Sequence, residues 1–198
     1  MNKSRGRPRK FDSQTALHKA MLVFWQKGLS ATSLDDLSLA MDMKRPSIYN
    51  AFGNKEAIYR TALAQFCSQL DIGIEKTLYN EPDLRKGLLA FYDQALSVYC
   101  SAEPAPGCFM MCTAPAEAMA HPDIRSDIAV LIARVDEKLE NRVKQALKEG
   151  AIPISSDPKL VAKMIQAVLH SLALRARAGE TKPSLKKIAR FSVQCFFG

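Results

Sequence analysis

Residues 31–59 read ATSLDDLSLAMDMKRPSIYNAFGNKEAIY, and this stretch carries the strongest structural pattern in the chain. Ser33, followed three residues later by Asp36, predicts a capped helix start, with Asp where a capping box usually has Glu or Gln. Asp42 predicts a tight turn, and Pro46 suits the first turn of a second helix, where a missing N–H costs nothing. Two short helices joined by a tight turn predict a helix-turn-helix, whose second helix enters the major groove of DNA.

The segments on either side of this stretch are also predicted to be helical. Upstream, Asp12 or Ser13 can cap a helix that ends at Gly28. Downstream, Asn54 can cap a further helix. No segment shows the clear alternation of a strand, so we predict an all-α fold. The later helices are expected over residues 83–101, 108–120, 123–148, 158–178 and 183–197, with a kink or an end at Pro115.

Composition and charge narrow the class of protein. Hydrophobic residues make up 47% of the 198 and charged residues 24%, which excludes a disordered or fibrous chain. The net charge is +8, and residues 1–60 hold 11 basic and 5 acidic side chains, or +6 of that charge. Such an excess attracts a polyanion, although a solvated basic tail has the same composition. We expect a basic arm over 1–10, a helix-turn-helix domain over 11–56 and a helical domain over 57–198.

The outward face of the second helix of the motif carries side chains suited to DNA. Arg45 can donate two hydrogen bonds to O6 and N7 of guanine, and Pro46 can contact a thymine methyl group. Lys55 lies where a helix begins, so its ammonium and the free N–H groups can share a phosphate. An ordinary three-helix subdomain with a polar face is the alternative. The predicted DNA contacts of this region are Thr32, Ser33, Lys44, Arg45, Pro46, Ser47, Tyr49, Asn50, Asn54 and Lys55.

The N-terminal arm provides a second candidate DNA contact. Its RGRPRK sequence begins at Arg5, and Arg5 and Arg7 can lie in a narrow A/T minor groove, whose negative potential attracts arginine. A solubilising tail has the same features, so both interpretations remain open.

Residues 31–59 resemble the DNA-binding signature of TetR-family transcriptional regulators, with motif similarity over about residues 11–63 and similar topology beyond. The resemblance implies that Tyr49 and Lys55 touch phosphates, and that Arg45, Pro46 and Ser47 read bases. Two residues depart from the family pattern. Asp42 stands where a glycine is common, at a small expected cost because Asp tolerates positive φ. Asp35 falls where a basic or polar phosphate contact is frequent, and its carboxylate would repel phosphate.

The same resemblance implies how the second domain works. The last two helices would form a four-helix interface with a symmetry mate, and the domain would bind a small-molecule inducer. The chain would then be a homodimeric repressor released from a palindromic DNA operator. If these helices pack only inside one chain, neither a dimer nor a palindrome is expected.

Aromatic and sulfur-containing side chains are the candidates for the inducer pocket, although such residues at helical spacing also pack ordinary cores. The segment GCFMMC, residues 107–112, resembles an element found in one branch of the family. His170 is expected to be a hydrogen-bonded core or pocket residue. The candidates are Phe66, Phe91, Tyr92, Tyr99, Cys108, Phe109, Met110, Met111, Cys112, Met119, Met164 and His170.

Cys108 and Cys112 share one helical face, which allows an alternative mechanism. The two sulfurs could bind Cu(I), or one thiolate could react with an oxidant or electrophile. A buried cysteine that serves as a small hydrophobic residue is the other interpretation. No Cys-x-x-Cys pair indicates a structural zinc site, so we expect no resident metal.

Other classes of protein have less support. The chain lacks a Gly-x-Gly-x-x-Gly loop, a P-loop, a His-Glu-x-x-His pair and a nucleophile elbow, so we expect neither an enzyme nor a cofactor. An architectural DNA-binding protein would use the same N-terminal features but would not need so large a second domain. The basic start has no apolar segment after it, and no apolar run is long enough for a membrane, so we expect a cytoplasmic protein without a membrane partner.

Overall fold

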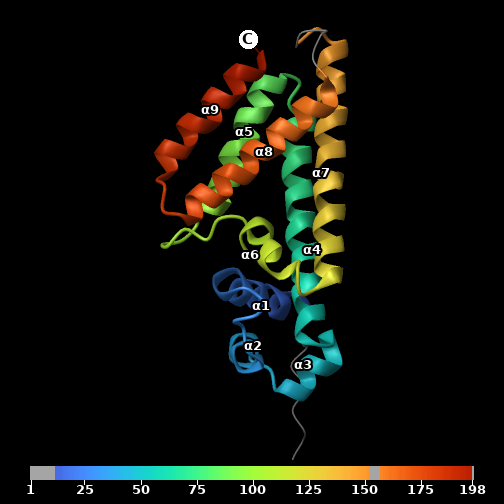
Figure 1. Cartoon of the computed structure of the whole chain (residues 1–198), viewed down its shortest axis with the longest axis vertical. Helices are drawn as coiled ribbons and strands as arrows, with labels where there is room; N and C mark the ends of the chain where they lie inside the picture. The colour runs from blue at the N-terminus through green and yellow to red at the C-terminus, as the bar shows by residue number, and fades with distance from the viewer. Residues whose placement is uncertain (1–11, 152–156, 198) are drawn as a thin grey trace, which may run out of the picture. The chain divides into compact units, whose positions relative to one another are not determined.

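The structure, a computed structural model, describes residues 12–151 and 157–197. Within these ranges all regular elements are helices and no strand is found, which confirms the predicted all-α fold (Figure 1). The chain divides into two compact units, Met1–Ala62 and Leu63–Gly198. The arm that contains Arg5 and Arg7 lies outside the described residues.

The described residues of the first unit form three helices and the beginning of a fourth. Inward-facing apolar side chains form its core, in which the rings of Phe24 and Tyr59 meet edge to face at 5.2 Å. Leu37, Ile48 and Ile58 are also fully buried in this unit. The helices are α1 (Ser13–Lys27), α2 (Leu34–Met41), α3 (Arg45–Phe52) and α4 (Lys55–Ile74).

The ends of these helices follow the capping residues that the sequence predicts. The Asp12 carboxylate accepts a hydrogen bond from the backbone of Gln14, and α1 ends at Gly28 with φ of 78°. Ser33 and Asp36 form the expected reciprocal capping box of α2. Asp42 adopts the left-handed conformation, with φ of 54°, and so performs the role for which glycine is common.

The described residues of the second unit form the rest of α4, a π-helical turn and five further α-helices. α4 continues into a π-helical turn, η1 (Glu75–Tyr79), which the sequence pattern did not predict. Pro115 lies within α6, which ends two residues later. The remaining helices are α5 (Leu84–Tyr99), α6 (Phe109–Glu117), α7 (Pro122–Lys148), α8 (Pro158–Arg177) and α9 (Lys182–Phe197).

Polar contacts fix how the long helices of this unit pack. Figure 1 shows α4 and α7 side by side, and Asp71 of α4 pairs with Arg134 and Lys138 of α7. On the other side of the unit, α5 packs against both α8 and α9. The hydroxyl of Tyr92 in α5 donates to the carbonyl of Ile165 in α8 over 3.0 Å. These contacts tie α4 to α7 and α5 to α8 within the second unit.

A buried arginine holds the turn between η1 and α5. Arg142 of α7 is only 1% exposed, and its guanidinium donates to the carbonyls of Leu78 (2.6 Å), Glu81 (3.1 Å) and Pro82 (2.8 Å). The Leu78 carbonyl lies near the C-terminal end of η1, where helix carbonyls carry partial negative charge. A positive charge can therefore be buried here beside carbonyl groups.

Candidate functional site

α3 presents a continuous polar surface. Ile48 is fully buried in the first unit, and this contact sets which side of the short helix faces solvent. Pro46 lies in the first turn, so the helix begins where the sequence predicts. The side chains that share the exposed surface are Lys44, Arg45, Pro46, Ser47, Tyr49 and Asn50. All six were predicted to face DNA, and α3 brings them together.

Arg45 and Asp35 form an ion pair between the starts of α3 and α2. Arg45 Nε donates to Asp35 Oδ1 over 3.0 Å, and Arg45 Nη2 lies 2.5 Å from Asp35 Oδ2. The hydrogen bond and charge of Asp35 raise the pKa of Arg45. Asp35 is thus not an isolated negative charge, because the adjacent guanidinium compensates it.

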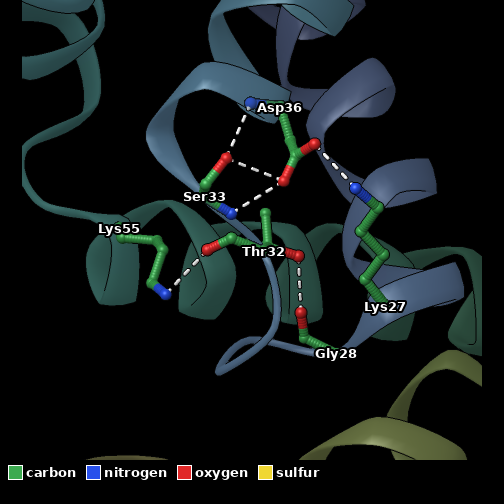
Figure 2. A network of polar contacts seen from close by, with 6 residues as sticks. All are labelled: Lys27, Gly28, Thr32, Ser33, Asp36 and Lys55. Atoms are coloured by element: carbon green, nitrogen blue, oxygen red, sulfur yellow. Dashed lines mark hydrogen bonds and ion pairs between the residues drawn. The ribbon is translucent and has the colours of Figure 1, made fainter.

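Figure 2 shows how the loop before α2 is fastened to the beginning of α4. Lys55 Nζ donates to the carbonyl of Thr32 over 2.8 Å. Thr32 itself is buried, and its hydroxyl donates to the carbonyl of Gly28 over 2.6 Å. The Thr32 hydroxyl therefore serves the fold rather than the exposed surface, unlike the contact predicted from the sequence. Lys55 keeps N–H groups beyond the one that Thr32 accepts.

The polar contacts of Ser33 and Asn54 are also largely structural. Ser33 belongs to the capping box with Asp36, whose other carboxylate oxygen lies 2.6 Å from Lys27 Nζ (Figure 2). The Lys27 ammonium and hydrogen bonds from Ser33 hold the pKa of Asp36 well below its usual value. Asn54 Oδ1 accepts from the backbone of Ala57 over 2.8 Å, which caps α4 as predicted. Both residues are exposed, but these side-chain oxygens already have partners.

The second unit contains a cavity of about 210 Å³. Its walls come from α4, α5, α6, α7 and α8, together with Cys108 at the start of α6. None of the lining side chains is Asp, Glu, Lys or Arg. The lining residues are Phe66, Gln69, Leu70, Gly73, Phe91, Gln94, Ala95, Val98, Tyr99, Cys108, Met110, Met111, Val135, Gln166, Leu169 and His170.

The cavity includes part of the predicted ligand-binding set. Phe66, Phe91, Tyr99, Cys108, Met110, Met111 and His170 line it. Tyr92 is instead held in the core by its bond to Ile165, and Phe109 is buried with its ring edge to face with that of Phe66. The Cys112 thiol lies 3.8 Å from the carbonyl of Ala173. Met119 and Met164 are exposed, so neither lines the cavity.

Three glutamines in the cavity wall were not predicted. Gln69 in α4, Gln94 in α5 and Gln166 in α8 each lie three residues from another lining residue, within a stripe of otherwise apolar positions. A polar residue that interrupts an apolar helical stripe is the sequence signal that identifies them. A search for aromatic and sulfur-containing residues alone does not identify these glutamines.

The amide of Gln166 has a defined orientation. Its Nε2 donates to the Asp136 carboxylate over 2.8 Å and to the Ile132 carbonyl over 3.2 Å. Both amide hydrogens therefore have protein acceptors, and Oε1 is the atom that remains for a ligand. Burial lowers the pKa of nearby His170, although Asp136 opposes this shift. His170 is thus favoured in its neutral form, which keeps the wall uncharged.

The cysteines near the cavity are held as thiols. Burial raises the pKa of Cys108 to about 11, and it also raises the pKa of Cys112. A thiolate is the reactive and metal-binding form, so both residues are poorly poised for that chemistry at neutral pH. Among the described residues, no three His, Cys, Asp or Glu side chains gather into a metal-binding group.

The matches to family models cover both units. Residues 16–62 match the model described as bacterial regulatory proteins, tetR family, and residues 85–191 match that of a tetracyclin repressor-like C-terminal domain. The chain belongs to the TetR family. The HTH-type transcriptional repressor ComR of Escherichia coli (strain K12) is 32% identical over 190 residues, which cover 96% of this chain and 90% of ComR. This TetR-family chain is a DNA-binding transcriptional repressor and not an enzyme.

Solved structures agree with this assignment. A cysteine mutant of the TetR family transcriptional regulator CifR, in complex with a 26-bp double-strand operator DNA, has a TM-score of 0.85 and 27% identity. That match covers 96% of this chain and all of CifR. The reduced form of E. coli NemR matches in fold, with a TM-score of 0.79 and 20% identity over 93% of this chain and 96% of NemR.

In the described part of this TetR-family chain, no helix has the length and apolar character of a membrane span.

Proposed function

We propose that the chain acts as a homodimer on a palindromic operator, with one copy of α3 in each of two successive major grooves. The observation that carries this proposal is the exposed surface of α3, whose first turn holds Arg45 and Pro46 over the buried anchor Ile48. The N-terminal residues of a recognition helix are those that reach base edges. Arg45, Pro46 and Ser47 are assigned to base reading, and Lys44, Tyr49, Asn50 and Lys55 to phosphate or sugar contacts.

Selection of bound sequences from random DNA tests this assignment. The wild-type chain is expected to enrich a two-fold symmetric site. Arg45→Ala should lose the preference at one position of each half-site, whereas Lys44→Ala should weaken binding to all sequences and reduce the salt dependence. Equal binding to all DNA by the wild-type chain would instead support an architectural protein.

The dimer is supported by apolar residues that remain exposed on α8 and α9. The single chain buries Ile165, Leu169 and Leu172 of α8, and Leu185 and Val193 of α9. A second stripe along α8 faces solvent and begins with Leu160 and Met164, which are four residues apart. Leu174 continues it, and Phe191 projects from α9. Exposed apolar stripes of this kind indicate an interaction surface, and a two-fold operator requires a two-fold protein.

The cavity is proposed as the inducer site, and its wall indicates the class of ligand. An engineered apolar cavity of about 150 Å³ holds benzene, so a cavity of about 210 Å³ fits a ligand somewhat larger than one ring. The absence of ionic side chains among its lining residues disfavours a charged ligand. Gln166 Oε1 favours a ligand that donates a hydrogen bond. We therefore assign the site to neutral, largely apolar molecules that carry one donor.

Thermal unfolding with matched probes tests the ligand class. 2-Naphthol is neutral and carries one donor, whereas 2-naphthoate has the same ring system and a negative charge. 2-Naphthol should raise the Tm more, since ligand that binds only the folded state stabilises it. Equal stabilisation by both compounds would contradict the assignment.

Ligand binding is proposed to release the operator by changing the populations of two dimer geometries. Only one geometry would place both recognition helices in successive grooves. A thiol- or copper-responsive mechanism has less support, because burial keeps Cys108 and Cys112 protonated. Release by Cu(I) or by a thiol-reactive compound, lost in Cys108→Ala, would favour that mechanism instead. The proposed site of action is the cytoplasm, where the operator DNA lies.

A further inference from the structure

Asp35 and Arg45 make a two-point contact that α2 does not need to cap its own start. α2 already has a complete capping box from Ser33 and Asp36. The side chain of Asp35 is 74% exposed, and that of Arg45 is 53% exposed. Exposed ion pairs contribute little to folding, because restricting the two side chains costs entropy and water weakens the attraction between the charges. The contact therefore calls for an explanation other than the stability of the unit.

Arg45 lies at an electrostatically unfavourable position in its helix. Arg45 is the first residue of α3, where the helix dipole disfavours a positive charge. Asp35 lies in the first turn of α2, where the dipole favours a carboxylate. The Asp35 carboxylate offsets the unfavourable placement of Arg45 and limits the directions in which its guanidinium can point.

The atoms involved determine which edge of the guanidinium stays available. Arginine has five N–H donors. Nε and one hydrogen of Nη2 face Asp35, which occupies the side edge of the group. The other Nη2 hydrogen and one Nη1 hydrogen lie parallel on the end edge, and the second Nη1 hydrogen points back towards Cδ. Two parallel donors on that edge match O6 and N7 of a guanine in the major groove.

We propose that Asp35 is a positioning residue that holds the side edge of Arg45, so that the end edge of Arg45 reads a guanine. This inference rests on the proposed function, in which Arg45 contacts a base. It assigns a positive role to a residue whose charge alone would oppose contact with phosphate.

The positioning role and the effect of charge predict opposite outcomes when Asp35 is removed. Charge alone predicts that Asp35→Ala tightens binding to every DNA, because a negative group is removed near the phosphates. Positioning predicts that discrimination in favour of guanine falls, whatever happens to the overall affinity. Affinity and discrimination are therefore measured separately.

The experiment compares full-length variants on two duplexes at one salt concentration. The contacted base pair is first found as the position whose guanine preference disappears in Arg45→Ala. Kd is then measured for the selected duplex and for the same duplex with that G·C pair replaced by A·T. The ratio of these Kd values is expected to fall about tenfold in Asp35→Ala, since a bidentate contact carries discrimination of roughly this size.

Two control variants separate positioning from charge and from folding. Asp42→Asn removes the same charge from the first unit and suits the left-handed backbone at φ of 54°, so it should leave the ratio unchanged. Asp35→Ala placed in an Arg45→Ala background should cause no further change in the ratio. Circular dichroism and Tm verify that α2 stays folded in each variant.

The outcomes distinguish this inference from the proposed function. If Arg45→Ala loses the guanine preference but Asp35→Ala keeps the wild-type ratio, the positioning role is overturned and base reading by Arg45 stands. If Arg45→Ala loses no preference at any position, base reading by Arg45 fails and the inference fails with it. A fall in the ratio of similar size in Asp42→Asn would assign the effect to charge and also overturn the positioning role.

Discussion

At the scale of single residues, His170 makes the stability of the chain depend on pH. Burial lowers its pKa in the folded state, whereas the pKa of an unfolded histidine is about 6.5. Below that pH the unfolded chain takes up a proton more readily than the folded one, so His170 lowers the free energy of unfolding as the solution is acidified. Neutral pH retains the full stability.

We expect His170→Gln to reduce this pH dependence. Urea unfolding of the wild-type protein and the His170→Gln variant at pH 7.5 and pH 5.5 checks this expectation. His18 and His121 are present in both proteins. The wild-type chain should lose more stability between the two pH values than the variant. Equal losses would show that His170 does not carry this dependence.

Arg142 is the single side chain whose loss should harm the fold most directly. Arg142→Met keeps much of the buried apolar stem but leaves the carbonyls of Leu78, Glu81 and Pro82 without their donors. The bond to Leu78 is buried and the other two are partly buried, so we expect Arg142→Met to lower the free energy of unfolding by about 2–4 kcal/mol. Denaturant titration measures this loss. The exposed Lys144→Met change on the same helix should cost well under 1 kcal/mol.

Residues that act locally were predictable, and residues that act through distant partners were not. Asp12, Ser33, Asp42 and Asn54 serve caps and turns, which depend on atoms only a few residues away. Arg142 contacts carbonyls some 60 residues upstream in the sequence, and no local pattern indicates such a bond. Thr32 illustrates the same limit, because its burial depends on the packing of the whole unit.

At the scale of elements, the approach of α6 to α8 depends on Gly107. Its φ is +68°, and a Cβ added there would lie 2.7 Å from the carbonyl oxygen of Ala173 in α8 and 2.7 Å from Cys112 Sγ. A backbone carbonyl cannot move aside as a flexible side chain can. The glycine therefore permits both a left-handed turn and a close helix contact just before Cys108, which lines the cavity.

Gly107→Ala is expected to lower the free energy of unfolding by about 1–3 kcal/mol, through backbone strain and overpacking. Gly150→Ala is the matched control, because its φ is +72° and an added Cβ there meets nothing within 4 Å. The difference between the two variants in denaturant unfolding isolates the contact with α8. If both lose the same amount, strain alone accounts for the effect.

The elements of the second unit were predicted better than its cavity. Helices up to 27 residues long have apolar stripes and Pro or Gly boundaries, which are visible in the sequence. The π-helical turn over Glu75–Tyr79 has no such marker and was missed. The cavity depends on side chains from five helices that meet only after folding, so Gln69, Gln94 and Gln166 could be placed on stripes but not assigned to a common wall.

At the scale of the whole molecule, self-association should depend on the exposed apolar residues of α8 and α9. Leu174 is 52% exposed and Phe191 is 68% exposed in the single chain. Leu174→Glu and Phe191→Glu place a charge where we propose that a second chain packs, and an unpaired charge in an interface core is strongly unfavourable. Each variant is expected to weaken the dimer by at least tenfold.

Sedimentation equilibrium across a range of concentrations measures this change. Val130→Glu on α7 is the control, because Val130 is 62% exposed but lies outside the proposed interface. It should associate as the wild-type chain does. Loss of the dimer in Val130→Glu, with dimers retained in the other two variants, would place the interface on α7 instead.

The uncharged wall of the cavity has a consequence for where the signal originates. A molecule that is stable among Phe66, Phe91 and Leu169 without an ionic partner also partitions into lipid acyl chains. If the proposed ligand class is right, such a molecule crosses a bilayer without a dedicated transporter. A ligand of this class then reaches the chain whether it forms outside the cell or in the cell's own metabolism.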